Sequence, residues 1–157
     1  MLLQELEGLC GARQMPLVLC GDFNSTPDSA AVELLVHETV DPKHPDLEYD
    51  KIGILPPVSQ LTHTLGLVSA VAQVQGAEPA ITNFTSNYKG CLDYIFLNDS
   101  LAAVSCLEMP SEEDLLAVDG TFMPNSVYPS DHVAICVDVR LAGRGGVVSG
   151  GGVPGVY

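Results

Sequence analysis

The stretch PLVLCGDFNSTPDS, residues 16–29, decides the fold class of this chain. Its first half is a continuous apolar run that is too short for a buried helix, which predicts a central β-strand that breaks at Gly21. Its second half contains Thr26-Pro27-Asp28, the residue types that begin a helix, and we expect that helix to run to about His37. A buried strand followed at once by a helix is typical of a layered α/β domain.

Upstream and downstream segments extend this pattern. Apolar residues at helical spacing predict an amphipathic helix over residues 2–10, ended by Gly11. Residues 38–60 are rich in proline and lack periodicity, which predicts a long irregular connection. A short helix is expected over 65–74, stopped near Gly76.

The last third of the chain reads mainly as strands. We expect a strand, turn and strand over residues 81–97, with Gly90 supplying a left-handed backbone in the turn. Further expected elements are a strand over 101–109, a capped helix over 111–118, a strand over 133–139 and a disordered Gly-rich tail over 141–157. The predicted fold class is α/β with a mixed sheet.

Composition restricts the classes of protein that this chain can be. The 157 residues are 46% apolar and carry a formal net charge of −14, which indicates one folded domain with a core. No apolar run reaches the roughly 20 residues of a membrane span. Glu5 and Glu7 stand where a secretory leader would be basic, so we expect a soluble protein that is not exported.

Cysteine spacing points to reduced thiols. The five cysteines are widely spaced with no CxxC pair, and three of them fall in apolar strand-like runs, so we expect buried free thiols in a cytoplasmic or nuclear protein. The cysteines are Cys10, Cys20, Cys91, Cys106 and Cys136.

The strong negative charge disfavours polyanions. With 6 Lys and Arg residues against 20 Asp and Glu residues, most of the surface would repel RNA. Phosphate chemistry on this chain would need bound metal ions or cationic surface from elsewhere.

Polar residues follow the predicted strands at three points. Asp22 and Asn24 are two residues apart, so a strand would place them on one side, although Gly, Asp and Asn are also ordinary turn residues. Asp93 lies inside the apolar run CLDYIFL, where a carboxylate needs a partner. His132, next to Asp131, is the partner that we predict, because an Asp–His pair fixes the imidazole tautomer. A purely structural hydrogen bond would produce the same pair.

The turn over residues 82–89 could contact a nucleotide. Tyr88 is the more exposed ring of this turn by its position and could stack on a base, whereas Phe84 fits equally well in the core. Lys89 is the local candidate for a phosphate contact. His37, His44 and His63 have no visible partner in the sequence.

The segments GDFNSTPDS, TNFT, NYKGCLDYIF and YPSDH, in this order, resemble the endonuclease/exonuclease/phosphatase superfamily. More narrowly, with VDPKHPDLEYDKIGIL and LTHTLGLVSA, the chain is similar to plant-type members of the carbon catabolite repressor type of poly(A) deadenylase. The similarity covers residues 1–140 and implies part of a four-layer α/β sandwich. It also implies a 3′–5′ exoribonuclease that uses two Mg²⁺ ions, takes poly(A) RNA as substrate and releases AMP.

The resemblance also implies roles for individual residues. Asp22 matches the aspartate that orients the attacking water and contributes to the metal site, and Asp131 matches an acidic residue that supports the metal. Asp93 and His132 match the catalytic Asp–His pair. The substrate contacts implied are those of Asn24, Asn83, Tyr88 and Lys89, with Asn24 at the phosphate and terminal adenosine and Tyr88 at the terminal base.

Departures from the family pattern are equally informative. The family's metal-anchoring glutamate lies in an LQE motif in the N-terminal half of the domain, and although Leu3-Gln4-Glu5 has these letters, its helical surroundings argue against that role. Val71 stands where an aromatic residue usually follows Ser-Ala, and a leucine-rich segment for a scaffold partner is absent. We therefore expect residues 1–140 to match the C-terminal half of the domain.

Three functions follow as expectations. The first is the deadenylase, with a scaffold protein as a possible further partner. The second is another phosphodiesterase of the same superfamily, and the third is a non-catalytic fragment that lacks the metal-anchoring glutamate.

Overall fold

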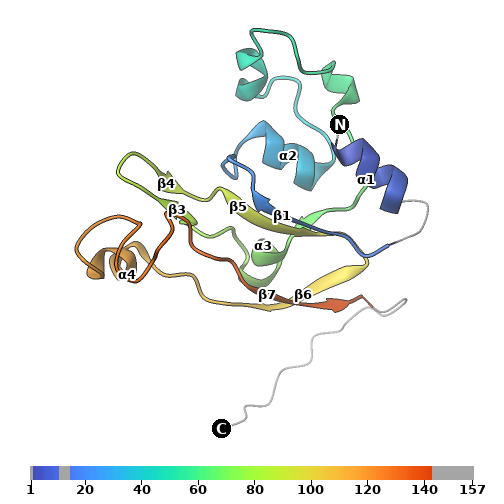
Figure 1. Ribbon diagram of the computed structural model, residues 1–157. Helices are drawn as coiled ribbons and strands as arrows, with labels where there is room; N and C mark the ends of the chain where they lie inside the picture. The colour runs from blue at the N-terminus through green and yellow to red at the C-terminus, as the bar shows by residue number, and fades with distance from the viewer. Residues whose placement is uncertain (1, 11–14, 143–157) are drawn as a thin grey trace.

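The computed structural model describes residues 2–10 and 15–142 (Figure 1). Gly11 and residues 143–157, most of the predicted Gly-rich tail, lie outside this part, and Leu141 belongs to a strand instead of the tail. The fold class is confirmed as α/β. Every pair of strands that the structure describes is antiparallel, in place of the mixed sheet that we expected. The elements in chain order are α1 (Leu2–Cys10), β1 (Val18–Asp22), α2 (Ala30–His37), η2 (Pro45–Tyr49), η3 (Val58–Gln60), β2 (Val68–Ser69), α3 (Ala70–Gln75), β3 (Asn83–Phe84), β4 (Lys89–Gly90), β5 (Asp93–Leu97), β6 (Leu101–Cys106), α4 (Glu112–Ala117) and β7 (Val137–Leu141).

The main sheet has three antiparallel strands in the order β1-β5-β2. The prediction of a central, buried strand over 16–23 is wrong, because β5 occupies the centre and most of β1 is exposed. The expected break at Gly21 is also wrong, since Gly21 stays in the strand and pairs with Tyr94. An apolar run reports strand propensity, but the position of a strand within its sheet depends on partners that the run does not specify.

The core is built around β5. Tyr94, Phe96 and Leu97 are almost fully buried, and the rings of Tyr94 and Phe96 stack with centroids 5.4 Å apart. Phe23, directly after β1, meets both rings edge-on at 5.8 and 5.4 Å. This aromatic cluster fixes the chain on either side of the polar ends of β1 and β5.

Helix α2 begins later than predicted. Ser29, not Thr26, caps it by accepting a hydrogen bond from the Val32 amide at 3.3 Å. Thr26 instead accepts the Ser29 amide through its carbonyl oxygen, in a turn before the helix. The helix ends at His37 as predicted.

The long connection after α2 is irregular, as predicted, apart from the 3₁₀ turns η2 and η3. Its end is fixed by His63, which is 3% exposed. The ring contacts the Leu34 carbonyl oxygen through Nε2 at 2.8 Å and accepts the Leu65 amide at Nδ1 at 3.1 Å. His63 therefore has a structural role that the sequence did not reveal.

Helix α3 lies between the main sheet and the β6–β7 pair, and it contacts both β5 and β6 (Figure 1). It runs from Ala70 to Gln75, with Ser69 as its N-cap and Gly76, which has a φ of 84°, as its C-cap. The helix predicted over 65–74 therefore begins later than expected, because Val68 and Ser69 form β2. The strand predicted over 133–139 begins only at Val137, because the preceding residues run alongside the β3 segment instead. The capped helix after Ser111 is confirmed, with a capping box between Ser111 and Asp114.

The predicted hairpin has a different register. β3 pairs with the short strand β4, whereas the second predicted strand, β5, pairs with β1 and β2. Gly90 is not left-handed as predicted. It lies in β4, where an added Cβ would stand 2.6 Å from the Tyr88 hydroxyl oxygen, so any other residue here would require the Tyr88 side chain to shift.

The thiols are free, but their burial was predicted only in part. Cys10 and Cys91 are buried, and burial raises the pKa of Cys91 to about 11. Cys20 and Cys136 are exposed. Cys20 lies in β1, which is at the edge of its sheet, and Cys136 lies just before β7, outside any strand. Within the described ranges, no helix is both long and apolar enough to cross a membrane.

The first prediction concerns Asn98, a buried residue that ties the start of β1 to the end of β5. Its Oδ1 accepts the Leu17 amide at 3.0 Å and its Nδ2 donates to the Met15 carbonyl oxygen at 2.9 Å. Asn98→Ala should lower the free energy of unfolding by about 1–3 kcal/mol, because both backbone groups lose their partner. Urea unfolding measures this loss. Asn87→Ala, in an exposed turn, is the matched control, and equal stability of the two variants would contradict the prediction.

Candidate active site

Two carboxylates face each other where the β1–β5 ladder ends. The strand register pairs Asp22 directly with Asp93. Like charges at directly opposed positions of an antiparallel pair destabilise it. The end of the ladder therefore needs a positive or proton-donating group nearby.

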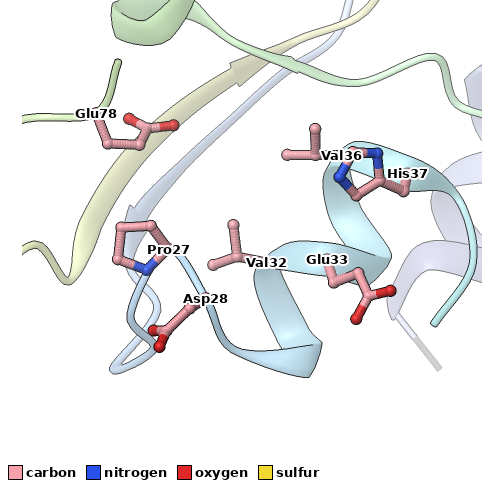
Figure 2. Close-up of a pocket in the computed structure, with 7 residues that line it drawn as sticks. All are labelled: Pro27, Asp28, Val32, Glu33, Val36, His37 and Glu78. Carbon is pink, nitrogen blue, oxygen red and sulfur yellow. The ribbon is translucent and has the colours of Figure 1, made fainter. Parts of the chain in front are cut away.

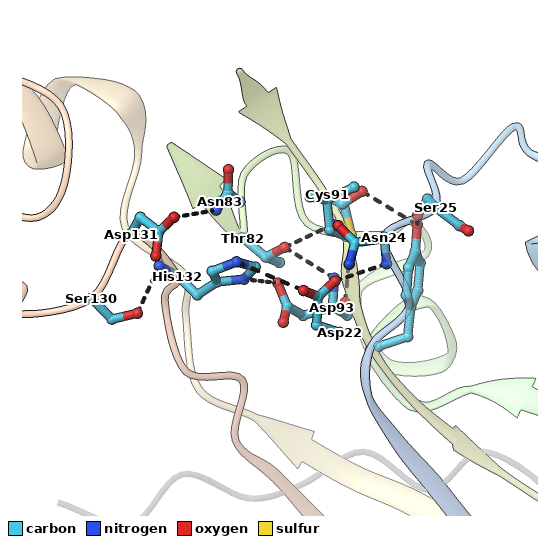
Figure 3. A network of polar contacts seen from close by, with 12 residues as sticks. Asp22, Asn24, Ser25, Thr82, Asn83, Cys91, Asp93, Ser130, Asp131 and His132 are labelled. Atoms are coloured by element: carbon cyan, nitrogen blue, oxygen red, sulfur yellow. Dashed lines mark hydrogen bonds and ion pairs between the residues drawn. The ribbon is translucent and has the colours of Figure 1, made fainter. Parts of the chain in front are cut away.

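His132 supplies that group (Figure 3). Its Nδ1 lies 2.8 Å from Asp93 Oδ2, which is a hydrogen bond, and its Nε2 lies 3.9 Å from Asp22 Oδ2, which is too long for one. The structure thus places the imidazole between the two carboxylates, tightly held on one side and open on the other. All three side chains are partly exposed, so the open side is accessible to solvent.

The environment changes the proton affinity of His132. Partial burial on its own would lower the pKa of the imidazole, but the hydrogen bond and charge of Asp93 outweigh it, with smaller contributions from Asp22 and Asp131. The net result is a raised pKa. The imidazolium form is therefore favoured beside the two carboxylates.

The backbone around His132 is held by its neighbours. His132 forms an isolated antiparallel bridge with Asn83, and the Ser130 hydroxyl accepts the His132 amide at 3.1 Å. The segment after Tyr128 is thereby fixed against the hairpin. Sequence reasoning did not single out Ser130 as a site residue, although its position two residues before the histidine is typical of a local side-chain turn.

Asn24 reaches the site by a turn, not by strand alternation. It has a φ of 47°, and its amide donates to Asp22 Oδ1 at 2.8 Å. The expectation that a strand places Asp22 and Asn24 on one side is therefore wrong. The strand ends at Asp22, and the hydrogen bond from the Asn24 amide to the Asp22 carboxylate forms a turn there. Asn24 is exposed at the rim of the site.

Asn83 and Asp131 meet on the other side of His132. Asn83 Nδ2 lies 3.4 Å from Asp131 Oδ2, and the Asp131 carbonyl oxygen accepts the Phe84 amide at 3.0 Å. Asn83 is 5% exposed, so its amide mainly orients the Asp131 carboxylate in this structure.

Tyr88 and Lys89 are less free than the sequence indicated. Tyr88 is half-buried, its hydroxyl has no hydrogen-bond partner among the described residues, and burial raises the pKa of this phenol. Lys89 Nζ forms an ion pair with Glu112 Oε2 at 2.7 Å. Glu112, at the start of α4, was not predicted as a site residue, and no local pattern connects it with Lys89.

The residues present do not complete a metal site. Throughout residues 2–10 and 15–142, no group of three or more His, Cys, Asp or Glu side chains could hold a metal ion. The two predicted metal residues each use one carboxylate oxygen in another contact, Asp22 with the Asn24 amide and Asp131 with Asn83. A metal ion at this site would therefore need ligands beyond the described residues.

A separate cavity of about 400 Å³ lies beside α2 (Figure 2). Three carboxylates line it, and burial raises the pKa of one of them, Glu78. Such a negative lining disfavours phosphate, so this cavity is not part of the candidate site. The lining residues are Pro27, Asp28, Val32, Glu33, Val36, His37 and Glu78.

The second prediction tests the proton affinity of His132. Asp93→Asn should lower the pKa of the imidazole more than Asp22→Asn does, because Asp93 contributes both the hydrogen bond and the nearer charge. NMR titration of the His132 ring protons measures both changes. Asp138→Asn, on exposed β7, is the control and should leave the value unchanged.

The raised pKa of His132 makes the stability of the fold depend on pH. The stabilisation from protonated His132 is complete below the ordinary imidazole pKa of 6.5, and it is lost as the pH rises through the raised pKa of the folded protein. The loss of thermal stability in Asp93→Asn should therefore be larger near about pH 6 than near about pH 9. A loss that is equal at both pH values would contradict this assignment.

The sequence of the chain is similar to those of known proteins. The model of the endonuclease/exonuclease/phosphatase family matches residues 1–132. Carbon catabolite repressor protein 4 homolog 1 of Arabidopsis thaliana is 40% identical over 91% of this chain and 27% of its own length. The CCR4-Not complex 3′-5′-exoribonuclease subunit Ccr4 of Aspergillus clavatus is 39% identical over 86% of this chain and 20% of its own length.

A solved structure agrees in fold. ANGEL2, a 2′,3′-cyclic phosphatase solved in complex with adenosine-2′,3′-vanadate, superposes on this chain with a TM-score of 0.71 and is 26% identical to it. The match covers 90% of this chain and 50% of the ANGEL2 chain. The chain spans about a quarter of the length of the first curated relatives that it matches. It belongs to the endonuclease/exonuclease/phosphatase family.

Proposed function

We propose that this chain carries catalytic residues of a 3′–5′ exoribonuclease that shortens the poly(A) tails of mRNA and releases AMP. The observation that supports this most directly is His132, hydrogen-bonded to Asp93 at 2.8 Å and facing Asp22 at 3.9 Å, in a family whose similar members include a named 3′-5′-exoribonuclease. The activity, substrate and partners of the whole protein are part of this proposal.

The geometry supports a division of labour between the two sides of His132. In hydrolysis, water attacks the phosphorus of the terminal nucleotide, the bond from phosphorus to the preceding 3′ oxygen breaks, and AMP leaves. Asp22 orients the water and accepts its proton, and His132 Nε2 donates a proton to the departing 3′ oxygen. Asp93 keeps Nδ1 protonated, so that Nε2 is the nitrogen that faces the reaction.

The ion that we propose is Mg²⁺, with two ions in the complete domain. Asp22 and Asp131 are the oxygen ligands that the described residues offer, together with ligands that these residues do not provide. When bound, Mg²⁺ polarises the phosphoryl oxygens and offsets the negative charge of the chain. Metal dependence in general is expected of nucleases in this family.

Substrate recognition is assigned to the rim of the site. We propose that Asn24 contacts the phosphate and terminal adenosine, Asn83 contributes a polar contact, Tyr88 stacks on the terminal base and Lys89 contacts phosphate. Lys89 Nζ would have to leave its ion pair with Glu112 to do so.

The relatives also support proposals about the wider setting of the chain. We propose that residues 1–140 correspond to the C-terminal half of the domain; the match to half of the ANGEL2 chain supports the extent of this segment. One relative is named as a subunit of the CCR4-Not complex, which supports a scaffold protein as partner and work in the cytoplasm or nucleus.

A second candidate function has one specific observation in its favour. The structural similarity to a 2′,3′-cyclic phosphatase favours hydrolysis of a cyclic phosphate at an RNA end. Both reactions need a water positioned against phosphorus and a proton donor for the leaving oxygen, so substrate identity, not site geometry, separates them.

The third prediction is a direct test of activity. The purified 157-residue chain with Mg²⁺ should shorten a 5′-labelled RNA that ends in poly(A), as a ladder on a gel. EDTA and His132→Ala should each abolish the ladder, because they remove the metal and the proton donor. RNA ending in poly(U) and RNA ending in a 2′,3′-cyclic phosphate are run in parallel.

The outcomes separate the readings. Equal action on poly(U) would refute poly(A) specificity, and release of phosphate from the cyclic end without shortening would favour the second candidate. A folded chain with no activity on any substrate would support the non-catalytic fragment. His37→Ala, at the exposed C-terminal end of α2, is the matched histidine control and should retain activity.

The fourth prediction concerns the ion pair of Lys89. Glu112→Gln should lower the KM for RNA by about twofold to fivefold, because it removes a competitor for the Lys89 charge at a partly exposed pair. Lys89→Gln should raise KM by a similar factor. Glu113→Gln, its neighbour on α4, is the control. An unchanged KM in Lys89→Gln would show that Lys89 does not contact the substrate.

A further inference from the structure

We propose that Thr82 is the positioning residue that holds Asp93 and His132 in register with each other. The assignment rests on the contacts of one buried threonine, and its catalytic significance rests on the proposed nuclease function. Thr82 lies directly beside the pair of residues that it would position (Figure 3).

The side chain of Thr82 fixes the start of β5. Thr82 is 0% exposed, and its Oγ1 accepts two backbone hydrogen bonds, from the Leu92 amide at 2.9 Å and from the Asp93 amide at 3.1 Å. The Leu92 carbonyl oxygen in turn accepts the Phe23 amide at 2.9 Å, just after β1. One hydroxyl thus sets the backbone from which the Asp93 carboxylate projects.

The backbone of Thr82 fixes the segment that carries His132. Its carbonyl oxygen accepts the Val133 amide at 2.8 Å, and its own amide donates to the Gly90 carbonyl oxygen at 2.9 Å. The next residue, Asn83, forms the isolated bridge with His132. Asp93 and His132 are 39 residues apart in the chain. Thr82 bonds the amide of Asp93 directly and the amide of Val133, the residue after His132.

Threonine suits this position for a physical reason. The Leu92 and Asp93 amides both donate to the Thr82 hydroxyl oxygen in a site without solvent. Without that oxygen, both amides would be buried with no hydrogen-bond acceptor, which destabilises the fold. The branched Cβ also restricts χ1, so the hydroxyl oxygen stays where the amides need it. Valine has nearly the same shape without the acceptor, and serine has the acceptor without the second branch.

The experiment uses NMR on the purified chain without added metal or RNA. The Nδ1 proton of His132, hydrogen-bonded to Asp93, should give a downfield ¹H resonance, identified by its absence in His132→Gln. Thr82→Val should lose this resonance while keeping the dispersed spectrum of a folded chain. Thr82→Ser should keep it, because the oxygen acceptor is restored.

Thr85 provides a matched control in the same hairpin. Its Oγ1 also accepts two amides, those of Asn87 at 3.3 Å and Tyr88 at 3.0 Å, but it has no such contact with the β5 backbone. Thr85→Val should therefore keep the His132 resonance. If Thr82→Val keeps it too, or if all three variants lose it, the proposal is overturned.

A measurement on the unsubstituted chain covers the case in which Thr82→Val does not fold. Hydrogen exchange of the Leu92 and Asp93 amides should be as slow as exchange in the β1–β5 ladder. Exchange as fast as at the amide of Ser86, an exposed residue of the same turn, would overturn the proposal, since the Thr82 oxygen would then not be holding them.

Kinetics separates this proposal from the proposed function. Where the chain shortens RNA, Thr82→Val should lower kcat by at least about tenfold and change KM by less than about twofold, because a misplaced dyad affects the chemical step. An unchanged kcat in an active enzyme would overturn the positioning role. If the chain lacks nuclease activity but Thr82→Val alone loses the resonance, the positioning role stands and the proposed function fails.

Discussion

The repulsion between Asp22 and Asp93 is the constraint on which the site depends. The strand register places the backbones of these residues opposite each other, and it is held by the β1–β5 ladder, whose other pairs carry the core residues Tyr94 and Phe96. His132 lies between them because a group that can be positively charged relieves the repulsion. The arrangement that stabilises the end of the sheet is thus the same one that prepares an acid next to a carboxylate.

The organisation of the fold follows from this requirement. Helices and the long loop cover one side of the main sheet, and α3 separates it from the β6–β7 pair (Figure 1). The short hairpin β3–β4 then carries Asn83 to the bridge with His132. Elements with little core of their own are held by hydrogen bonds to buried polar residues, and His63 and Thr82 are two examples.

Sequence reasoning could predict which residues meet but not how the backbone brings them together. The apolar surroundings of Asp93 demand a partner, and an imidazole next to a strand is a natural one, so their contact could be expected from chemistry alone. The position of β1 at a sheet edge could not, because edge and centre differ in partners and not in composition. Gly90 illustrates the same limit, since a glycine against which a side chain packs and a glycine in a left-handed turn look alike in a sequence.

The space above Gly90 has a consequence for binding. The Tyr88 hydroxyl fills the volume that any other residue's Cβ would occupy, so the ring acts as part of the hairpin's packing. If a base turns this ring away from Gly90, the hole left behind subtracts from the gain of stacking. The affinity for such a base would then be the difference between the free energy of stacking on Tyr88 and the free energy of packing Tyr88 against Gly90. Binding would be favourable only where the stacking term is the larger of the two.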